Sequence, residues 1–317
     1  MTRKLKIAFL MDPFEKLDLN GDTTFALALE AQKRKHEIFH FLPEDLFLKS
    51  NEVFANICKF ELSSNNVENN YKYYNKVIKP LDEYDVVMMR QDPPFDLSYI
   101  TATHILEKIS SKALVVNNPY EVRNAPEKIF VTNFSHLMPK TLITKDINII
   151  KSFRDEFEDI IIKPLYGNGG QGVFHVLPED ENFYSIIEMF FKQSNEPLMI
   201  QEYLKDVRKG DKRIILLNGE IVGSINRVPQ KGESRSNMHV GGKPEKTILT
   251  KRDKFICKEI SQSLKDKGLY FVGIDIIGEY ITEINVTSPT GIREIKSYSS
   301  IIIEEMFWDF IEKKLNV

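Results

Sequence analysis

Three oxygen-bearing side chains, Asp275, Glu283 and Asn285, lie close together in an otherwise apolar part of the sequence. Side chains alternate between the two faces of a strand, so Glu283 and Asn285 share one face. A turn at residues 278–280 would place Asp275 opposite Glu283 across a hairpin, where two carboxylates repel unless a cation lies between them. Oxygen ligands of this kind suit Mg²⁺ that enters with nucleotide phosphates, and do not suit zinc. The pattern therefore predicts a magnesium site, with a lysine-paired surface carboxylate as the alternative.

A run of glycines, GNGGQG at residues 167–172, follows a lysine, Lys163, at the end of an apolar strand. The run fits the G-x-G-x-x-G pattern of dinucleotide-binding proteins, but a β-type segment follows it where that motif needs a helix. A Walker loop is also excluded, because Val173 stands where that loop carries its lysine. We expect a glycine hairpin whose N–H groups close over phosphates that Lys163 also reaches. The alternative is an ordinary glycine-rich turn.

Five arginines could surround a reacting anion with positive charge. They are Arg213, Arg227, Arg235 and Arg293, with Arg90 from the first third of the chain. A lone arginine is usually solvated, but these gather around residues 229–242, a polar loop that contains glycines and few apolar side chains. Such a loop is typical of a lid that closes over a reactive intermediate.

No protein nucleophile or zinc site is indicated. The motifs G-x-S-x-G and H-E-x-x-H do not occur, and the six histidines form no zinc pattern. His36 and His40 are four residues apart near an expected strand, without a third ligand, so we expect a structural role. Cys58 and Cys257 lie far apart in the sequence and are expected to be reduced thiols.

Composition limits the partners. The net charge of -3 over 317 residues lacks the basic excess of nucleic-acid binders, so we expect a small anionic ligand and no nucleic acid. Asp12-Pro13 stops the first apolar run too early for a signal peptide, and no later segment could span a bilayer. We therefore expect a cytoplasmic protein without a membrane partner.

The first third of the chain alternates strands with helices. Strands are expected at residues 5–11, 37–42, 85–90 and 113–117, and helices at 23–35 and 97–109. This order predicts a parallel α/β lobe. Three of the strands run into proline-containing turns, which should face a ligand cleft because open α/β sheets bind ligands beyond such strand ends. The polar stretch 63–75 is expected to be a surface excursion.

The pattern changes after Asn124 to a second, α+β region. The expected elements are a helix from Pro126, a strand at 140–143, a helix from Lys145, strands at 160–163 and 173–176, hairpins at 213–225 and 270–286, and helices at 251–267 and 301–315. A chain of this length usually divides into lobes with a cleft between them.

Several segments together resemble bacterial glutathione synthetases, which belong to the ATP-grasp superfamily. They are Met11-Asp12-Pro13, MRQDPPFD at 89–96, Lys163-Pro164-Leu165, Gly210-Asp211-Lys212-Arg213 and TEINVTSPT at 282–290. The resemblance spans nearly the whole chain, and the proline-rich turn and the TEINVTSPT run are specific to the synthetases. Gln91 and Gly291 depart from the family pattern, which can carry lysine and cysteine there.

The resemblance implies an α/β fold of three lobes: an N-terminal α/β substrate-binding lobe at residues 1–124, a central ATP-grasp lid lobe at 125–205 and a C-terminal ATP-grasp catalytic lobe at 206–317. ATP would be bound by Lys128, Lys163, Gly167, Gly169, Gly170, Gln171, Gly172, Asp211 and the hinge Glu202, Tyr203 and Leu204. Arg213 and Arg227 would be catalytic. The peptide substrate would be bound by Arg90, Arg235, Asn237, Ser288, Thr290 and Arg293. Asp275, Glu283 and Asn285 would hold Mg²⁺, with Mn²⁺ as an alternative.

The implied reaction is the last step of glutathione synthesis. The cysteinyl carboxylate of γ-glutamylcysteine attacks the γ-phosphate of ATP, and glycine displaces phosphate from the acyl phosphate, which requires no protein nucleophile. Two alternatives stay open: another carboxylate–amine ligase, such as a D-alanine:D-alanine ligase, and a catalytically silent ATP-binding module. The family also implies a homo-oligomer, such as a tetramer.

Overall fold

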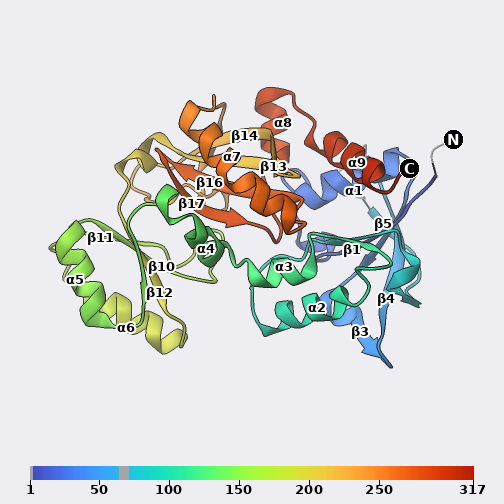
Figure 1. Ribbon diagram of the computed structural model, residues 1–317, viewed down its shortest axis with the longest axis horizontal. Helices are drawn as coiled ribbons and strands as arrows, with labels where there is room; N and C mark the ends of the chain where they lie inside the picture. The colour runs from blue at the N-terminus through green and yellow to red at the C-terminus, as the bar shows by residue number, and fades with distance from the viewer. Residues whose placement is uncertain (1–2, 64–70) are drawn as a thin grey trace.

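The computed structural model describes residues 3–63 and 71–317 and contains three β-sheets (Figure 1). The first sheet lies at one end of the molecule, the second at the opposite end, and the third lies between them, as Figure 1 shows. Within the described residues, no helix has both the length and the apolar character needed to cross a membrane.

The first sheet has the strand order β3-β4-β2-β1-β7-β8, and β5 and β6 also pair with β4. Its strands are β1 (Lys6–Leu10), β2 (Glu37–Phe41), β3 (Leu46–Lys49), β4 (Glu52–Leu62), β5 (Tyr71–Tyr73), β6 (Val77–Pro80), β7 (Val86–Met89) and β8 (Leu114–Val116). The predicted parallel strands β2, β1, β7 and β8 are confirmed.

The first lobe also contains strands that the parallel pattern did not include: β3, β5 and β6 pair antiparallel with β4, which is itself antiparallel to β2. A tight hairpin makes β3 antiparallel to β4. Its two turn residues, Ser50 and Asn51, have φ of 48° and 69°, the conformation that two-residue hairpin loops favour. Of the polar stretch 63–75, residues 64–70 lie outside the described part of the chain.

Side-chain caps start the main helices of this lobe. Asp22 accepts a hydrogen bond from the backbone N–H of Phe25 at the start of α1 (Thr23–Lys33), and Asp96 accepts one from Tyr99 at the start of α2 (Leu97–Glu107). Each cap satisfies a backbone donor that has no partner inside its helix. The last aspartate of the MRQDPPFD run is therefore a helix cap. Shorter helices are η1 (Phe14–Lys16), η2 (Pro43–Asp45), η3 (Leu81–Glu83) and α3 (Pro119–Asn124).

The second sheet is antiparallel, in the order β11-β10-β12-β9. Its elements are β9 (Thr141–Thr144), α5 (Ile147–Phe157), β10 (Ile160–Pro164), β11 (Phe174–Val176), α6 (Phe183–Gln193) and β12 (Leu198–Glu202). One hydrophobic cluster, which includes Ile150, Ile162, Phe183, Ile187 and Ile200, is made entirely within this segment. The central sheet and its two helices therefore have a core of their own.

The third sheet is also antiparallel, in the order β15-β14-β13-β16-β17. Its strands are β13 (Asp211–Leu217), β14 (Glu220–Val228), β15 (Lys243–Glu245), β16 (Phe271–Ile277) and β17 (Tyr280–Asn285). The helices of this part are η5 (Lys205–Lys209), η6 (Met238–Val240), α7 (Lys251–Asp266), α8 (Ile292–Ser299) and α9 (Ile303–Lys314), and the early segments α4 (Glu127–Phe130) and η4 (Val131–Leu137) pack against β17. The two predicted hairpins are confirmed.

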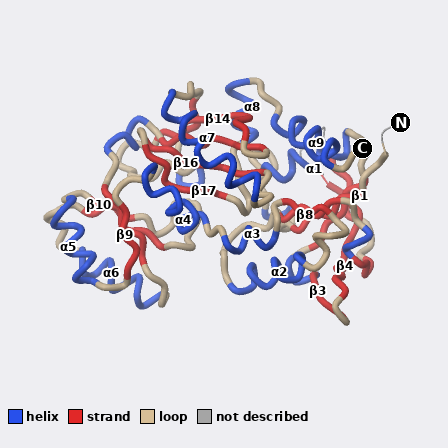
Figure 2. Tube along the Cα trace, in the orientation of Figure 1, coloured by secondary structure: helices blue, strands red, loops and turns tan. Residues whose placement is uncertain are grey.

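The first and third sheets share hydrophobic cores. One cluster joins Phe9 and Leu27 of the first lobe to Ile225, Phe271 and Trp308. Figure 2 shows α1, α8 and α9 grouped together at this junction. Trp308 donates its indole N–H to the carbonyl oxygen of Leu27 at 2.8 Å. The last helix therefore binds the C-terminal sheet to the N-terminal lobe.

The two histidines have the structural contacts expected of them. His36 Nδ1 accepts a hydrogen bond from the Leu5 backbone N–H at 3.2 Å, and its Nε2 lies 2.9 Å from Glu312. His40 Nε2 lies 3.2 Å from the carbonyl oxygen of Met11. Cys58 and Cys257 are free and buried.

Candidate active site

A cavity between the second and third sheets brings together most of the residues predicted to bind ATP. These lining residues are Lys128, Lys163, Gly167, Gly169, Gly170, Gln171, Glu202, Tyr203, Leu204 and Asp211. The cavity is also lined by Arg235 and Asn237 of the loop 229–242, and by Asp275 and Glu283 of the third sheet. Two sheets and one loop therefore meet around a single space.

The glycine run forms the turn between β10 and β11, which pair antiparallel. Gly169, Gly170 and Gly172 have φ of 60°, 81° and 67°, a region that other residues rarely adopt. A Cβ on Gly170 would lie 2.8 Å from Asn237 Oδ1, so the turn and the loop 229–242 approach closely here. Gly172 does not line the cavity; its position packs behind the turn, against Phe190 and Pro164.

The carboxylate hairpin has the predicted register. Asp275 on β16 pairs with Glu283 on β17, and Gly273 pairs with Asn285. Asn285 does not line the cavity, and its Nδ2 donates to the Gly273 carbonyl oxygen at 3.1 Å, which leaves its amide oxygen as the atom that could face a cation.

Protein cations neutralise both carboxylates. Asp275 accepts hydrogen bonds from Arg213 Nε at 2.6 Å and Nη2 at 2.9 Å, and Arg227 Nη2 lies 3.0 Å from Asp275 Oδ1. Glu283 Oε1 lies 3.6 Å from Nζ of both Lys128 and Lys163. Glu283 is thus paired with lysines, but inside the cavity and not at the surface.

The described residues contain no cluster of three or more His, Cys, Asp and Glu side chains that could hold a metal ion unaided. Two carboxylates and an amide oxygen nevertheless fit Mg²⁺, which usually takes one or two protein carboxylates and completes its shell with phosphate and water oxygens. The donor set around Asp275 and Glu283 is therefore suited to magnesium brought in with a nucleotide.

Burial and charge shift the pKa values of these groups in different directions. Burial acts to raise the pKa of Asp275, but Arg213 and Arg227 outweigh it and hold the pKa far below its ordinary range. Burial also acts to raise the pKa of Glu283, but the positive charges of Lys128 and Lys163 outweigh it and lower the pKa. Both carboxylates are therefore charged at neutral pH and ready for a cation.

Asp211 differs from these two carboxylates. It accepts hydrogen bonds from Arg227 Nη2 at 2.5 Å and from the Ser236 hydroxyl at 2.8 Å, yet burial raises its pKa to about 6. Its other oxygen, Oδ1, has no hydrogen-bond partner among the described residues. Asp211 therefore joins the loop 229–242 to the buried arginine and retains a free acceptor.

The residues predicted to form the hinge, Glu202, Tyr203 and Leu204, lie at the end of β12 and line the cavity. Glu202 Oε1 accepts from the Lys140 backbone N–H at 3.1 Å. The Tyr203 ring stacks on His175 with a centroid distance of 3.8 Å, and its hydroxyl accepts from Arg208 Nε at 3.0 Å. The sequence analysis did not single out His175. Its position on β11, the strand that follows the glycine run and pairs with β10, could have indicated it.

The loop 229–242 contacts the glycine turn directly. Arg235 forms an ion pair with Glu233 at 2.7 Å and donates from Nη1 to the Gly170 carbonyl oxygen at 3.2 Å. A Cβ on Gly242 would lie 1.9 Å from the Ser236 carbonyl oxygen, so only glycine fits there. The loop therefore lies over the cavity as a lid would.

The other residues predicted to bind the peptide lie outside this cavity, where β7 ends against the TEINVTSPT run. Arg90 is buried and donates to the Thr24 hydroxyl at 3.0 Å and the Pro289 carbonyl oxygen at 3.1 Å. Its Nη1 has no hydrogen-bond partner among the described residues. Ser288 donates to the Arg90 carbonyl oxygen at 3.4 Å, so Arg90 and Ser288 meet.

Thr290 and Arg293, which were also predicted to bind the peptide, take part in hydrogen bonds to backbone carbonyl oxygens. The Thr290 carbonyl oxygen accepts from Arg213 Nη1 at 3.2 Å, which connects the run to that arginine. Arg293 is partly exposed and donates to the Asn20 carbonyl oxygen at 3.0 Å, apart from Arg90. At Gly291, φ is 114°, a conformation that favours glycine over the cysteine that the resemblance allowed at this position.

Some lining residues escaped the sequence reasoning. They are Ile161, Gln201, Val207, Ser234, Ser236, Ile277 and Thr282 among others. Ile161 lies two residues before Lys163 on β10 and Gln201 two before Tyr203, so strand alternation could have found both. Ser236 carried no such signal, because its partner Asp211 is distant in sequence.

Comparison with known proteins places the chain in a family. A family model described as prokaryotic glutathione synthetase, N-terminal domain, matches residues 5–123, and one described as prokaryotic glutathione synthetase, ATP-grasp domain, matches residues 127–300. The glutathione synthetase of Mesorhizobium japonicum is 56% identical over 311 residues, covering 98% of this chain and 99% of that protein. That of Agrobacterium fabrum is 52% identical, covering 99% of this chain and 98% of that protein.

Solved structures agree on the fold. The ATP-grasp ligase PsnB complexed with a minimal precursor matches with a TM-score of 0.62 at 16% identity, covering 98% of this chain and 99% of that chain. The D-cycloserine synthetase DcsG matches with a TM-score of 0.67 at 10% identity, covering 96% of this chain and 99% of that chain. The three-sheet architecture is therefore an ATP-grasp fold.

Proposed function

Because the chain belongs to the prokaryotic glutathione synthetase family, we propose that the cavity between its second and third sheets is where ATP phosphorylates the peptide substrate. The enzyme is an ATP-dependent carboxylate–amine ligase that joins γ-glutamylcysteine to glycine and releases ADP and phosphate. The assignment of individual residues below is the proposed part.

One observation carries the assignment: Asp275 and Glu283 face each other across a hairpin, and four cationic side chains converge on them. Such an arrangement holds charges ready for an anionic ligand and its metal ion without a large change of structure. Mg²⁺, which a solved PsnB complex contains with ADP, would be held by Asp275, Glu283 and Asn285 and would neutralise phosphate charge. Mn²⁺ is the alternative ion.

Each group of residues around the cavity would then have a separate role. Lys128, Lys163 and the glycine turn bind the phosphates, and the hinge at Glu202, Tyr203 and Leu204 holds the base and ribose. Arg213 and Arg227 stabilise the charge that develops on the transferred phosphoryl group and on the tetrahedral intermediate. Arg235 and Asn237 exclude water from the acyl phosphate as part of the lid.

The peptide would bind beside Arg90, Ser288, Thr290 and Arg293, at the junction of the first and third sheets. The free Nη1 of buried Arg90 supports this, because an unpaired buried donor is costly unless a ligand or water accepts from it. The carboxylate to be phosphorylated would lie between this junction and Arg213, which contacts both Thr290 and Asp275.

The test is to measure ADP release by the purified protein with γ-glutamylcysteine and glycine, with other amine acceptors, and with ATP alone. We expect release to require the peptide, glycine and a divalent cation together, and Arg90→Ala to raise the KM for the peptide more than that for ATP. Equal release with D-alanine in place of both substrates would contradict the assignment. An unchanged KM for the peptide in Arg90→Ala would contradict only the proposed peptide site beside Arg90.

We also propose the lobe boundaries 1–124, 125–205 and 206–317, a cytoplasmic location and a homo-oligomer. The two free, buried cysteines and the thiol of the peptide substrate support a reducing compartment. Light scattering on the purified protein measures the assembly, and a monomer at micromolar concentration would contradict the proposed oligomer.

A further inference from the structure

Glu127 and Lys128 form a wall between two cavities. Lys128 lines the nucleotide cavity, and Glu127 does not. Glu127 lines a second, smaller cavity, with Pro93, Phe95, Pro126, Leu165, Tyr166, Asn168, Val286 and Thr287. Glu127 therefore contacts Lys128 from outside the lining of the nucleotide cavity.

The contacts of Lys128 account for two of its three N–H donors. Its Nζ donates to Glu127 Oε1 at 2.7 Å and to the Gly167 carbonyl oxygen at 2.5 Å. Glu283 Oε1, at 3.6 Å, is too far for a hydrogen bond. These two short contacts, one from outside the nucleotide cavity and one from the glycine turn that lines it, hold the ammonium, and Glu283 is the nearest acceptor for the remaining N–H.

We propose that Glu127 is a positioning residue, which sets the direction of the Lys128 ammonium so that its third donor and its charge face the phosphates. The inference rests on the proposed role of Lys128 as a phosphate-binding lysine. A carboxylate is the strongest acceptor available for this purpose, because hydrogen bonds between two charged groups are shorter and stronger than neutral ones. Lys128 otherwise has a flexible four-carbon stem with three rotatable donors.

Glu127 matters most when ligands are bound. If Mg²⁺ engages Glu283, that carboxylate attracts Lys128 less strongly, and Glu127 and the Gly167 carbonyl oxygen are then its principal contacts. The second of these belongs to the glycine turn, so Lys128 also ties α4 to the element that covers the phosphates. The side chain of a lysine held in this way is already ordered, so nucleotide binding does not have to restrict its rotation at each turnover.

A structural explanation of Glu127 also exists, and the experiment must separate it. Glu127 is the first residue of the four-residue helix α4, where an acidic side chain is favourable and where Pro126 supplies no side-chain cap. A structural role would lower stability and activity irrespective of the residue at 128. A positioning role would depend entirely on Lys128.

The experiment is a double-mutant cycle with Glu127→Gln and Lys128→Met, measured as kcat and KM for ATP at saturating peptide and glycine. We expect Glu127→Gln to lower kcat/KM for ATP about 10- to 100-fold, the range for a lost hydrogen bond between charged groups. In the Lys128→Met background the same change should have an effect under about twofold. An equal loss in both backgrounds, or no loss in the wild type, would overturn the inference.

Glu127→Asp provides the conservative variant and replaces Glu127→Gln in the cycle if the latter does not fold. It keeps the charge on a shorter stem, so it should retain more activity than Glu127→Gln; an Asp variant poorer than Gln would also overturn the inference. The matched control is Glu121→Gln, which removes a carboxylate of similar exposure, 18%, from Lys267 at 2.6 Å, and should leave kcat/KM unchanged. If Lys128→Met itself keeps the wild-type kcat/KM for ATP, the proposed phosphate-binding role of Lys128 is wrong. That result is distinct from failure of the Glu127 proposal, in which Lys128→Met is impaired but Glu127→Gln is not.

Discussion

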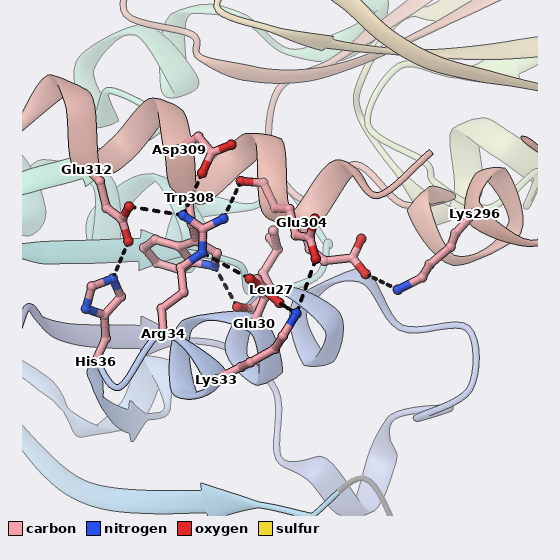
Figure 3. Close-up of polar contacts among 11 residues, drawn as sticks. Leu27, Glu30, Lys33, Arg34, His36, Lys296, Glu304, Trp308, Asp309 and Glu312 are labelled. Atoms are coloured by element: carbon pink, nitrogen blue, oxygen red, sulfur yellow. Dashed lines mark hydrogen bonds and ion pairs between the residues drawn. The ribbon is translucent and has the colours of Figure 1, made fainter. Parts of the chain in front are cut away.

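Two clusters of charged side chains differ in burial and in completeness. The inner cluster adjoins the cavity: Lys128, Lys163, Asp211, Asp275 and Glu283 line it, and Arg213 and Arg227 pair with these carboxylates without lining it. The outer cluster joins α1 to α9 and consists of Glu30, Lys33, Arg34, His36, Glu305, Asp309 and Glu312 (Figure 3).

Every nitrogen of the central arginine in the outer cluster has a partner. Arg34 donates from Nε to Glu30 at 3.0 Å, from Nη1 to Glu312 at 3.0 Å and from Nη2 to the Glu305 carbonyl oxygen at 2.9 Å. Figure 3 shows Arg34 between the two helices with Glu312 and Asp309 directed towards it. The cluster reaches solvent, since the Asp309 side chain is 70% exposed.

The inner cluster is buried and incomplete. Arg227 and Asp275 are 3% and 2% exposed, yet Arg227 Nε and Asp211 Oδ1 have no hydrogen-bond partner among the described residues. Burying charges is expensive, and ion pairs inside a protein seldom repay it in stability. We infer that the inner charges are arranged for a ligand that supplies the missing partners, whereas the outer charges hold α1 and α9 together and need no ligand.

Among substitutions in the two clusters, we expect the largest effect for Glu283→Gln. Loss of this proposed magnesium ligand should lower kcat roughly 10³-fold, because several kcal/mol of charge stabilisation depend on the ion. Asn285→Ala should act in the same direction. Glu312→Gln, in the outer cluster, is the matched control and should leave kcat within about twofold. Wild-type turnover of Glu283→Gln at limiting Mg²⁺ would refute the metal assignment.

Arg227→Lys should come next. A planar guanidinium can bind two phosphoryl oxygens at once and lysine cannot, so kcat should fall about 10²–10³-fold, or roughly 2.7–4 kcal/mol. ATP affinity should change much less, because the glycine turn and Lys163 still bind the ground state. Arg34→Lys is the matched substitution in the outer cluster, with kcat expected to be unchanged. A collapse of ATP affinity with normal kcat would make Arg227 a binding residue.

Arg34→Met, in the outer cluster, should have the opposite pattern of effects: it should lower the free energy of unfolding and leave kcat unchanged. Removing Arg34 leaves Glu30, which is 7% exposed, with Lys33 as its remaining ion-pair partner. Since the cluster is partly solvated, the loss should be about 1–2 kcal/mol in the free energy of unfolding, measured by urea titration. A large fall in kcat without loss of stability would show that the clusters are not separate in function.

The smallest effect concerns the loop 230–242 that closes the inner cluster. It offers few apolar contacts, so limited proteolysis should cut there first in the free enzyme. ADP, Mg²⁺ and product together should slow the cutting, because Arg235 and Ser236 then close over an occupied cavity. Cutting at the same rate with and without these ligands would argue against a lid.

Local patterns in the sequence predicted the pieces of the site that one element or one hairpin makes. Asp275 opposite Glu283 followed from strand alternation and a short turn, and the register confirms it. The strand–glycine–strand unit with Lys163 was equally local. Alternation and two-residue turns are properties of the backbone itself, so neighbouring residues are sufficient to indicate them.

Family resemblance supplied what local patterns could not. Lys128 lies in a short helix with no phosphate-binding signature of its own, and it was named only because the segments around it resemble a known family. The structure then places it in the cavity beside Glu283.

The pairing of charges depends on the packing of the folded chain. The sequence alone does not indicate that Arg227 lies against Asp211 and Asp275, that Glu127 pairs with Lys128, or that Arg34 joins α9. These choices depend on how the sheets pack and which groups lose water on burial. A charged residue in the sequence is compatible with many partners, and the enclosed geometry of the fold selects one.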